Sequence, residues 1–170
     1  MFRLVFVLML VFSGVVHSST CEEWYSLSAE QQYRLEYSYN YGKPDDLGYT
    51  LAAIALVESE AGLYKINLQT RDFGTHQINE KTLFATLGVT SYWKKNEIIT
   101  KVVVDDSLSA YLAMTVLKHF HKVHRGNWKK MVMSYNIGNR KDKKTIKRGK
   151  AYYNKVVSAV KMLKLCGGFK

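Results

Sequence analysis

Residues 53–64 read AIALVESEAGLY, and this stretch decides the fold. Its small and apolar residues predict a buried helix, expected over residues 47–61 and ended by Gly62. Ile54 and Glu58 are four residues apart, so the Glu58 carboxyl group leaves the helix from the same stripe as the core side chains. Burial without a cationic partner raises the pKa of a carboxyl group, and a proton donor must be neutral near neutral pH. Glu58 is therefore a candidate catalytic acid, although spacing alone leaves open an inert, solvated glutamate.

Helical periodicity returns in most of the remaining chain, whereas alternating stretches are scarce. A capping box at Ser28 opens one helix, which Gly42-Lys43-Pro44 should stop. Further helices are expected after a cap at Asp45 or Asp46, after Asp105, after Asn127, and over residues 149–165. Residues 63–80 lack a clean period and predict a loop or a short irregular β excursion. The sequence thus predicts a single compact, mainly α domain with a small excursion after the helix that carries Glu58.

Length and composition also point to one folded domain. The chain has 170 residues, of which 47% are hydrophobic and 13% aromatic, and this is too apolar for a disordered protein. The formal net charge of +11 indicates an anionic partner, either nucleic acid or the anionic polymers of a cell envelope. Residues 139–150, NRKDKKTIKRGK, are the most basic run and include Lys143, Lys144, Lys147 and Arg148.

The first residues have the layout of a secretory signal peptide. Arg3 precedes an apolar stretch, and small residues follow, with Val16 and Ser18 suited to a cut after Ser18. We therefore expect a signal peptide over residues 1–18, a domain over residues 19–170, and export to a periplasm or secretion. Export disfavours a nucleic-acid partner. An uncleaved membrane anchor is the alternative, but the apolar run is shorter than the roughly 20 residues that a span needs.

The chain contains two cysteines, Cys21 and Cys166. An exported protein meets an oxidising compartment, where an even number of cysteines is usually paired. We therefore expect a disulfide between Cys21 and Cys166, which would tie the two ends of the domain together. Two free thiols are the alternative.

Four short sequence motifs follow one another in the chain. They are Glu58-Ser59, then Gly74 with Gln77 and Ile78, then Tyr135-Asn136 with Gly138, and finally YYNKV at residues 152–156. Together they resemble the catalytic domain of the lytic transglycosylases, the soluble lytic transglycosylase branch of the lysozyme-like superfamily. The stretch VESEAGLYKINLQTRDFGTHQIN, residues 57–79, is most similar to the small one-domain members that accompany secretion, conjugation or phage entry systems. The resemblance covers residues 45–163 and implies an α+β lysozyme-like fold.

The resemblance also implies a role for six residues. Glu58 matches the family's single catalytic acid, and Ser59 matches the neighbour that helps to hold the site. The implied substrate-binding residues are Ser59, Gln77, Tyr135, Asn136 and Tyr152, of which Tyr152 matches the tyrosine close to the acid. The family usually has Leu and then Met or Phe where this chain has Thr75 and His76, and this departure bears on the shape of the sugar groove.

The activity that the resemblance implies is cleavage of peptidoglycan by one acid, without a cofactor, by a monomer. Glu58 would protonate the oxygen between N-acetylmuramic acid and N-acetylglucosamine and then deprotonate the muramyl 6-hydroxyl, which closes onto C1. Hydrolytic glycosidases need two carboxylates instead. Asp72 is a candidate second carboxylate for a goose-type muramidase, although capping of the Gly74 turn is the simpler prediction for it. A non-catalytic wall-binding or virion-structural protein is the alternative from another class.

The histidines give no clear metal site. His119 and His121 are two residues apart on an expected helix, so their side chains diverge, whereas a metal ion needs converging ligands. We therefore expect no metal at these residues or at His124. His76, next to Gln77, is either a structural histidine or a group that touches the substrate.

Overall fold

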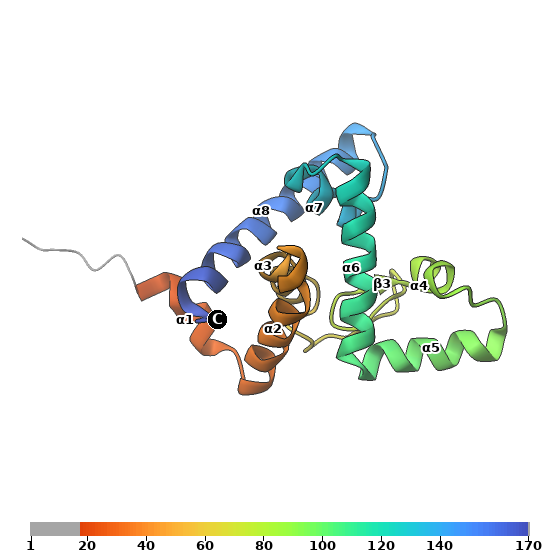
Figure 1. Ribbon diagram of the computed structural model, residues 1–170, viewed down its shortest axis with the longest axis horizontal. Coiled ribbons are helices and arrows are strands. Elements are labelled where there is room, and N and C mark those ends of the chain that lie inside the picture. Colours follow the sequence, from red (N-terminus) through yellow and green to blue (C-terminus); the bar gives the residue numbers. More distant parts are fainter. Residues whose placement is uncertain (1–17, 170) are drawn as a thin grey trace, which may run out of the picture.

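The computed structural model describes residues 18–169, so the predicted signal peptide lies outside the described residues except for Ser18. The described chain forms a compact, mainly helical domain with a small sheet, as predicted (Figure 1). The helices are α1 (Ser18–Ser26), α2 (Ala29–Gly42), the short 3-10 helix η1 (Lys43–Asp45), α3 (Gly48–Ser59), α4 (Glu80–Leu87), α5 (Tyr92–Val104), α6 (Asp106–Val123), α7 (Trp128–Ile137) and α8 (Lys143–Cys166). The strands are β1 (Ile66–Asn67), β2 (Asp72–Phe73) and β3 (Ile78–Asn79).

Helix α3 is the centre of the core. Its residues from Leu51 to Ala55 are fully buried, and α2, α6 and α8 pack around it (Figure 1). A helix that is apolar on every side has no solvent face, so its position is fixed by burial alone. Three successive residues with positive φ, at 60–62, end the helix directly after Ser59. The helix predicted from AIALVESEAGLY is confirmed, and its abrupt end places Glu58 in the last turn.

The start of α3 differs from the prediction. Neither Asp45 nor Asp46 caps this helix: Asp45 ends η1, and Asp46 follows in the left-handed conformation. Leu47 occupies the N-cap position and makes no side-chain capping bond. Pro44 explains the difference, because its fixed φ starts a separate 3-10 turn that displaces the aspartates from the helix entry.

Helices α4 and α5 were not expected from the pattern. Helix α4 has only eight residues, and a single apolar side chain within it, Leu83, is buried. In α5 the β-branched residues Ile98 and Val102 would suit a strand, but they stand four residues apart and both pack into the core. Tertiary packing therefore decides the structure of both segments.

Helix α8 begins earlier than predicted, at Lys143 instead of residue 149. Asp142 accepts a hydrogen bond from the Thr145 backbone N–H and so caps the helix inside the basic run. Gly149 therefore lies inside α8 and does not mark its start. A Cβ atom at this position would lie 2.9 Å from Ile137 Cδ1 on α7. The glycine instead lets α7 and α8 approach closely.

The three strands form a small antiparallel sheet in the order β1-β2-β3, within the segment predicted as a β excursion. Asp72 pairs with Asn79, and Phe73 pairs with Ile78. Gly74 follows β2 with φ +81, and a Cβ atom there would lie 2.6 Å from the Val102 carbonyl oxygen. Only glycine fits this close approach between the turn and α5.

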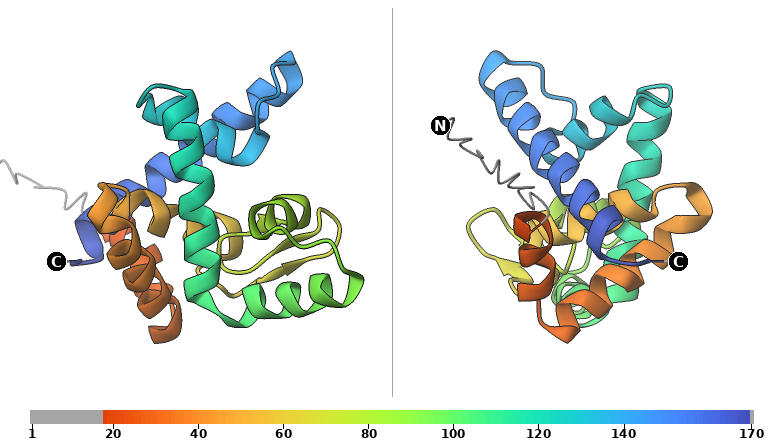
Figure 2. Two further views of the ribbon diagram at one scale, coloured as in Figure 1. Left: turned by 45° about the vertical axis from the view of Figure 1, so that its right-hand side comes forward. Right: turned by 90° about the vertical axis from the view of Figure 1, so that its left-hand side faces the viewer.

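Helix α6 divides the molecule. The sheet, α4 and α5 lie on one side of it, and α1 and α2 lie on the other, whereas α8 runs from the α1 side past α6, as both Figure 1 and the left view of Figure 2 show. A disulfide joins Cys21 to Cys166, with the two Cα atoms 5.6 Å apart, so the expected pairing is present. It fixes α1 to the end of α8.

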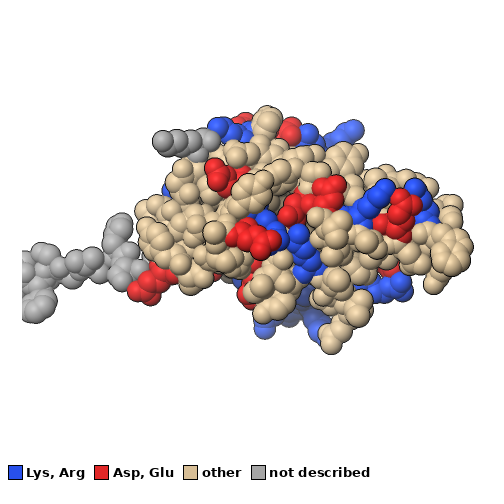
Figure 3. All heavy atoms as spheres, turned by 90° about the horizontal axis from the view of Figure 1, so that it is seen from below, with Lys and Arg blue, Asp and Glu red and all other residues tan. Residues whose placement is uncertain are grey.

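Charges on the described surface are mixed. On the face drawn in Figure 3, acidic side chains lie among Lys and Arg side chains, so the positive net charge does not form one continuous patch there. Among residues 18–169, none of the helices is both long and apolar enough to cross a bilayer.

Candidate active site

A polar cleft opens at the end of α3, where the sheet faces α7 and the start of α8. Its volume is about 580 Å³. The lining residues come from five parts of the chain: Glu58, Thr70, Asp72, Gln77, Ile78, Asn79, Thr82, Val116, Tyr135, Asn136, Arg140 and Arg148. The cleft continues into an adjoining hollow of about 490 Å³. Six residues line both: Asn79, Thr82, Val116, Tyr135, Asn136 and Arg140.

Glu58 is the acid of this cleft. The side chain is only partly exposed, and desolvation is the main reason that its pKa rises from an ordinary value to about 7. Interaction with the Tyr152 hydroxyl and the charge of Lys155 lower the pKa, whereas the nearby charge of Asp72 raises it. Desolvation dominates, so Glu58 exchanges its proton near neutral pH.

Two buried polar atoms at the site have no hydrogen-bond partner within the described chain, the hydroxyl oxygen of Tyr152 and the Oδ1 atom of Asn136. Burial and the charge of Glu58 raise the pKa of Tyr152 well above its usual value, so the phenol stays protonated. A buried polar atom without a partner is costly, and at a cleft it points to a ligand that completes the bond. Asn136 lines the cleft itself, whereas Tyr152 lies beside Glu58.

Ser59 holds the site and does not line it. Its side chain is buried; the hydroxyl donates to the Thr75 carbonyl at 2.6 Å and accepts from the Gly62 N–H at 2.8 Å. The bond to Thr75 joins the end of α3 to the turn after β2, and the bond from Gly62 closes the turn that ends α3. The placement fits a positioning role beside Glu58 and separates Ser59 from the residues that line the groove.

Gln77 and Tyr135 both line the cleft. Gln77 has a positive φ of 48, and its side-chain amide donates to the carbonyl oxygens of Tyr64 and Gly74. The Tyr135 hydroxyl donates to the His76 carbonyl oxygen at 2.9 Å. The turn that carries Gln77 is therefore attached to α7 as well as to α3.

His76 is structural. The ring is fully buried, lies within hydrogen-bond distance of the Ser38 and Ser109 hydroxyls, and does not line the cleft. Burial lowers its pKa to about 3, so the imidazole is neutral at physiological pH. The possibility that His76 touches the substrate therefore does not fit its position.

Asp106, at the start of α6, collects three partners from distant parts of the chain. It accepts hydrogen bonds from Arg34 on α2, from Lys65 before β1, and from the Thr75 hydroxyl. Burial raises the pKa of Asp106, but these three groups outweigh burial, and the pKa is lower than usual. The ionised carboxylate thus fastens the turn of residues 74–77 to the helical part of the domain.

Asp72 lies in the same cleft as Glu58, although the sequence favoured a local capping role. Its carboxylate accepts a hydrogen bond from the Asn79 side chain at 2.8 Å across the β2-β3 pair, whereas the Gly74 N–H bonds to Lys65. The prediction that Asp72 caps the Gly74 turn is therefore wrong. The strand places it so that its charge acts on Glu58.

The basic run splits between the cleft and the open surface. Arg140, after α7, and Arg148, in α8, line the cleft, whereas Lys143, Lys144 and Lys147 are exposed and do not. The basic run is visible in the sequence, but the fold decides which of its cations reach the cleft. Asn79 and Thr82 also line the cleft and were not predicted, because no sequence pattern indicates α4, which begins between them.

The histidines of α6 diverge. His119 lines the hollow that adjoins the cleft, and His124 ends the helix with Nε2 2.8 Å from the Ser134 hydroxyl. In the part of the chain that the structure describes, no group of three His, Cys, Asp or Glu side chains could hold a metal ion.

Comparison with known proteins agrees with the geometry of the site. A family model described as "Transglycosylase SLT domain" matches residues 25–157, which covers all the elements that line the cleft. Neither the curated proteins nor the solved structures include a match to this chain. The family match spans well over half of the chain. The chain therefore belongs to the transglycosylase SLT family, and it is an enzyme of the peptidoglycan lytic transglycosylase class.

Proposed function

We propose that this enzyme cleaves the β-1,4 bond between N-acetylmuramic acid and N-acetylglucosamine and leaves a 1,6-anhydro end, with Glu58 as acid and then as base. The observation that supports this most strongly is the desolvated carboxyl group of Glu58, whose pKa lies at about 7 inside a polar groove. A group of this pKa can both give and take a proton near neutral pH.

The reaction needs no water. Glu58 donates its proton to the glycosidic oxygen, and the bond from C1 to that oxygen breaks. The resulting carboxylate then removes the proton of the muramyl 6-hydroxyl, whose oxygen forms the new bond to C1. Glu58 ends the cycle protonated, as it began, because one proton leaves and one returns.

Binding of the sugars falls to residues around the acid. The unpartnered Oδ1 of Asn136 accepts a hydrogen bond from an N–H or O–H of the substrate. The Tyr152 hydroxyl, which has no hydrogen-bond partner within the described chain, lies beside Glu58 and lowers the pKa of that carboxyl group, so it stabilises the charged carboxylate. Gln77 and Tyr135 line the cleft. Ser59 holds the end of α3, which carries Glu58, against the turn that carries Gln77.

Hydrolysis by two carboxylates is a second candidate, because Asp72 lines the same cleft as Glu58. The two reactions differ in their products. After complete digestion of purified sacculi, we expect mass spectrometry to find muropeptides lighter by one water than hydrolysed ends. Hydrolysed ends as the main product would contradict the proposal and favour the muramidase reaction. Asp72→Asn separates them further, since it should stop hydrolysis but not anhydro-ring formation.

The pH dependence follows from the raised pKa of Glu58. The donor must be protonated in the free enzyme, so its active fraction is complete well below pH 7 and falls as the pH rises through about 7. We expect kcat/KM on soluble glycan strands to drop about tenfold for each pH unit above that point. Initial rates from pH 5 to 9 measure this. A rate limb near the ordinary glutamate pKa would contradict a desolvated acid.

The cleft arginines should recognise the carboxylates of the peptidoglycan stem peptides. In a Glu58→Gln background, Arg140→Gln with Arg148→Gln should weaken binding to sacculi at low salt by on the order of tenfold. Lys143→Gln with Lys144→Gln removes the same charge from the open surface and is the matched control. Sedimentation over a salt series measures both, and equal losses would show that net charge alone attracts the wall.

The cellular setting follows from the signal peptide predicted for residues 1–18. We propose export to a periplasm or secretion, action as a monomer, and service to a secretion, conjugation or phage entry machine. Peptidoglycan lies outside the cytoplasm, which agrees with export. Edman sequencing of the mature protein should start at residue 19, and an intact Met1 would contradict the signal peptide.

A further inference from the structure

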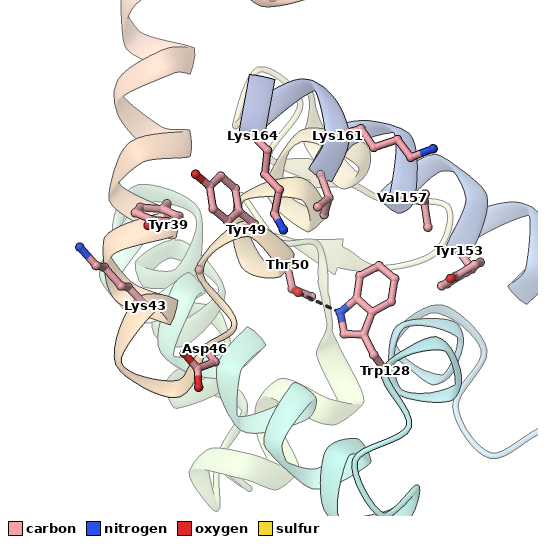
Figure 4. Close-up of a pocket in the computed structure, with 12 residues that line it drawn as sticks. Tyr39, Lys43, Asp46, Tyr49, Thr50, Trp128, Tyr153, Val157, Lys161 and Lys164 are labelled. Carbon is pink, nitrogen blue, oxygen red and sulfur yellow. Dashed lines mark hydrogen bonds between the residues drawn. The ribbon is translucent and has the colours of Figure 1, made fainter. Parts of the chain in front are cut away.

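A second groove lies at the opposite end of α3 from Glu58. Its volume is about 680 Å³, and none of its lining residues belongs to the active-site cleft. Thr50 lies in the first turn of α3, and Glu58 follows eight residues later, which separates the two sites by about 12 Å along the helix axis. α2, α7 and α8 supply the remaining walls (Figure 4).

Aromatic rings form both sides of this groove. On one side Tyr39 packs against Tyr49, with ring centroids 4.7 Å apart, and on the other Trp128 packs edge-on against Tyr153 at 5.4 Å. Figure 4 shows the two pairs on either side of Thr50, with Val157 on α8 near the pair of Trp128 and Tyr153.

The rings are held in place by specific contacts. The Trp128 indole N–H donates to the Thr50 hydroxyl at 3.0 Å. A Cβ atom at position 48 would lie 2.8 Å from the Tyr39 ring, so Gly48 is needed for this packing. The groove is therefore built in advance of any ligand, and binding costs little side-chain ordering.

Positive charge surrounds the rings. Lys43, Lys161 and Lys164 line the groove, against a single acid, Asp46. Lys164 Nζ lies 5.2 Å from the Tyr49 ring centre, and Lys43 Nζ lies 5.8 Å from that of Tyr39. Within residues 18–169 none of these three lysines is part of an ion pair. Their charges remain available to an anionic ligand.

We propose that this groove is a second binding site for the peptidoglycan strand, separate from the cleft that cuts it. Flat aromatic faces bury the apolar faces of sugar rings, and the lysines pair with the carboxylates that the muramyl groups and stem peptides carry. An uncharged glycan would not pair with the lysines, and an acidic peptide would bury less of the aromatic rings. An anionic glycan contacts both. The proposal rests on the proposed function, because that function makes an anionic glycan the substrate.

Two consequences follow for catalysis. A strand held in the groove keeps the enzyme on the wall between cuts, so loss of the groove lowers turnover of sacculi. A short soluble fragment occupies the cleft alone, so its turnover does not depend on the groove.

The test uses the Glu58→Gln protein, which binds without cutting, and intact sacculi. Adding Lys161→Glu and Lys164→Glu should weaken sedimentation with sacculi at low salt by on the order of tenfold. Lys122→Glu with Lys130→Glu makes the same charge change on exposed residues that do not line the groove, and is the matched control. Equal binding by the two double variants would overturn the proposal. All four lysines are exposed, so folding should not change, and circular dichroism checks this.

A ring variant gives an independent readout. Tyr49→Leu, added to the Glu58→Gln protein, should weaken sedimentation with sacculi even at high salt, where the charges of the lysines are screened. Sedimentation at high salt equal to that of the Glu58→Gln protein would overturn the role of the rings. A single-stranded DNA oligonucleotide is a further probe: if it alone binds through the lysines and sacculi do not, the groove is a nucleic-acid site and the proposal fails.

Failure of this proposal is distinct from failure of the proposed function. In the protein with Glu58 intact, Lys161→Glu with Lys164→Glu should leave kcat/KM on a soluble tetrasaccharide muropeptide unchanged and lower the rate on sacculi. If neither the protein with Glu58 intact nor its lysine variant cuts any substrate, the proposed reaction is wrong. The sedimentation experiment still shows whether the second groove binds the strand.

Discussion

Glu58→Gln should lower the rate of peptidoglycan cleavage by a factor on the order of 10² to 10⁴, because it removes the group proposed to protonate the glycosidic oxygen. The amide has nearly the same shape and keeps the site packed, but it has no proton to donate at neutral pH. A zymogram with embedded sacculi should show a cleared band for the natural sequence and none for the variant. Release of muropeptides, followed by chromatography, measures the residual rate.

Glu60→Gln is the matched control. It makes the same chemical change two residues further on, at an exposed position just after α3. Its rate should equal that of the natural sequence. The Glu58→Gln protein should still sediment with sacculi, which separates loss of chemistry from loss of folding. Full clearing by the Glu58→Gln protein would rule out Glu58 as the acid and leave the proposed mechanism without a donor.

Replacing both cysteines by serine should lower the free energy of unfolding by about 5 kcal/mol, because the disulfide closes a loop that covers most of the chain. The bond joins Cys21 to Cys166 across 145 residues of sequence and restricts the unfolded chain far more than the folded one. Urea unfolding followed by circular dichroism measures the difference.

A reductant gives the internal control for the disulfide. Dithiothreitol should lower the free energy of unfolding of the natural protein to about that of the double variant. It should not change the free energy of unfolding of the double variant. Neither cysteine lines the cleft, so activity at low temperature should survive in both. Equal stability of the natural protein and the Cys21→Ser, Cys166→Ser protein would show that the bond does not restrict the unfolded chain.

Much of the fold could be predicted because single local signals decide it. The apolar run of α3, the Ser28 capping box and the Asn127 cap each specify one helix without help from distant residues. Glu58 could be singled out for the same reason, since its register on α3 follows from spacing. The family resemblance then supplied the chemistry, and the family match bears out the assignment to the transglycosylases.

What could not be predicted depends on contacts between distant segments. Asp72 reaches the cleft through its pairing with Asn79, and no periodicity in the sequence reveals a two-residue strand. Arg140 and Arg148 line the cleft and their basic neighbours do not, and this difference depends on how α7 and α8 pack together. Ser59 and Tyr152 matched the family motifs, but only the fold shows that both side chains are buried and do not line the cleft.

The links through Asp106 bear on how this enzyme can be inactivated by mutation. The Asp106 carboxylate binds Arg34, Lys65 and Thr75, none of which lines the cleft, and so the turn that carries Gln77 is anchored to α2 and α6. In a random mutant library selected for loss of wall lysis, we expect many of the folded but inactive clones to carry changes at these anchoring positions. Damaging substitutions would then be found at the residues that anchor the active-site cleft as well as at those that line it.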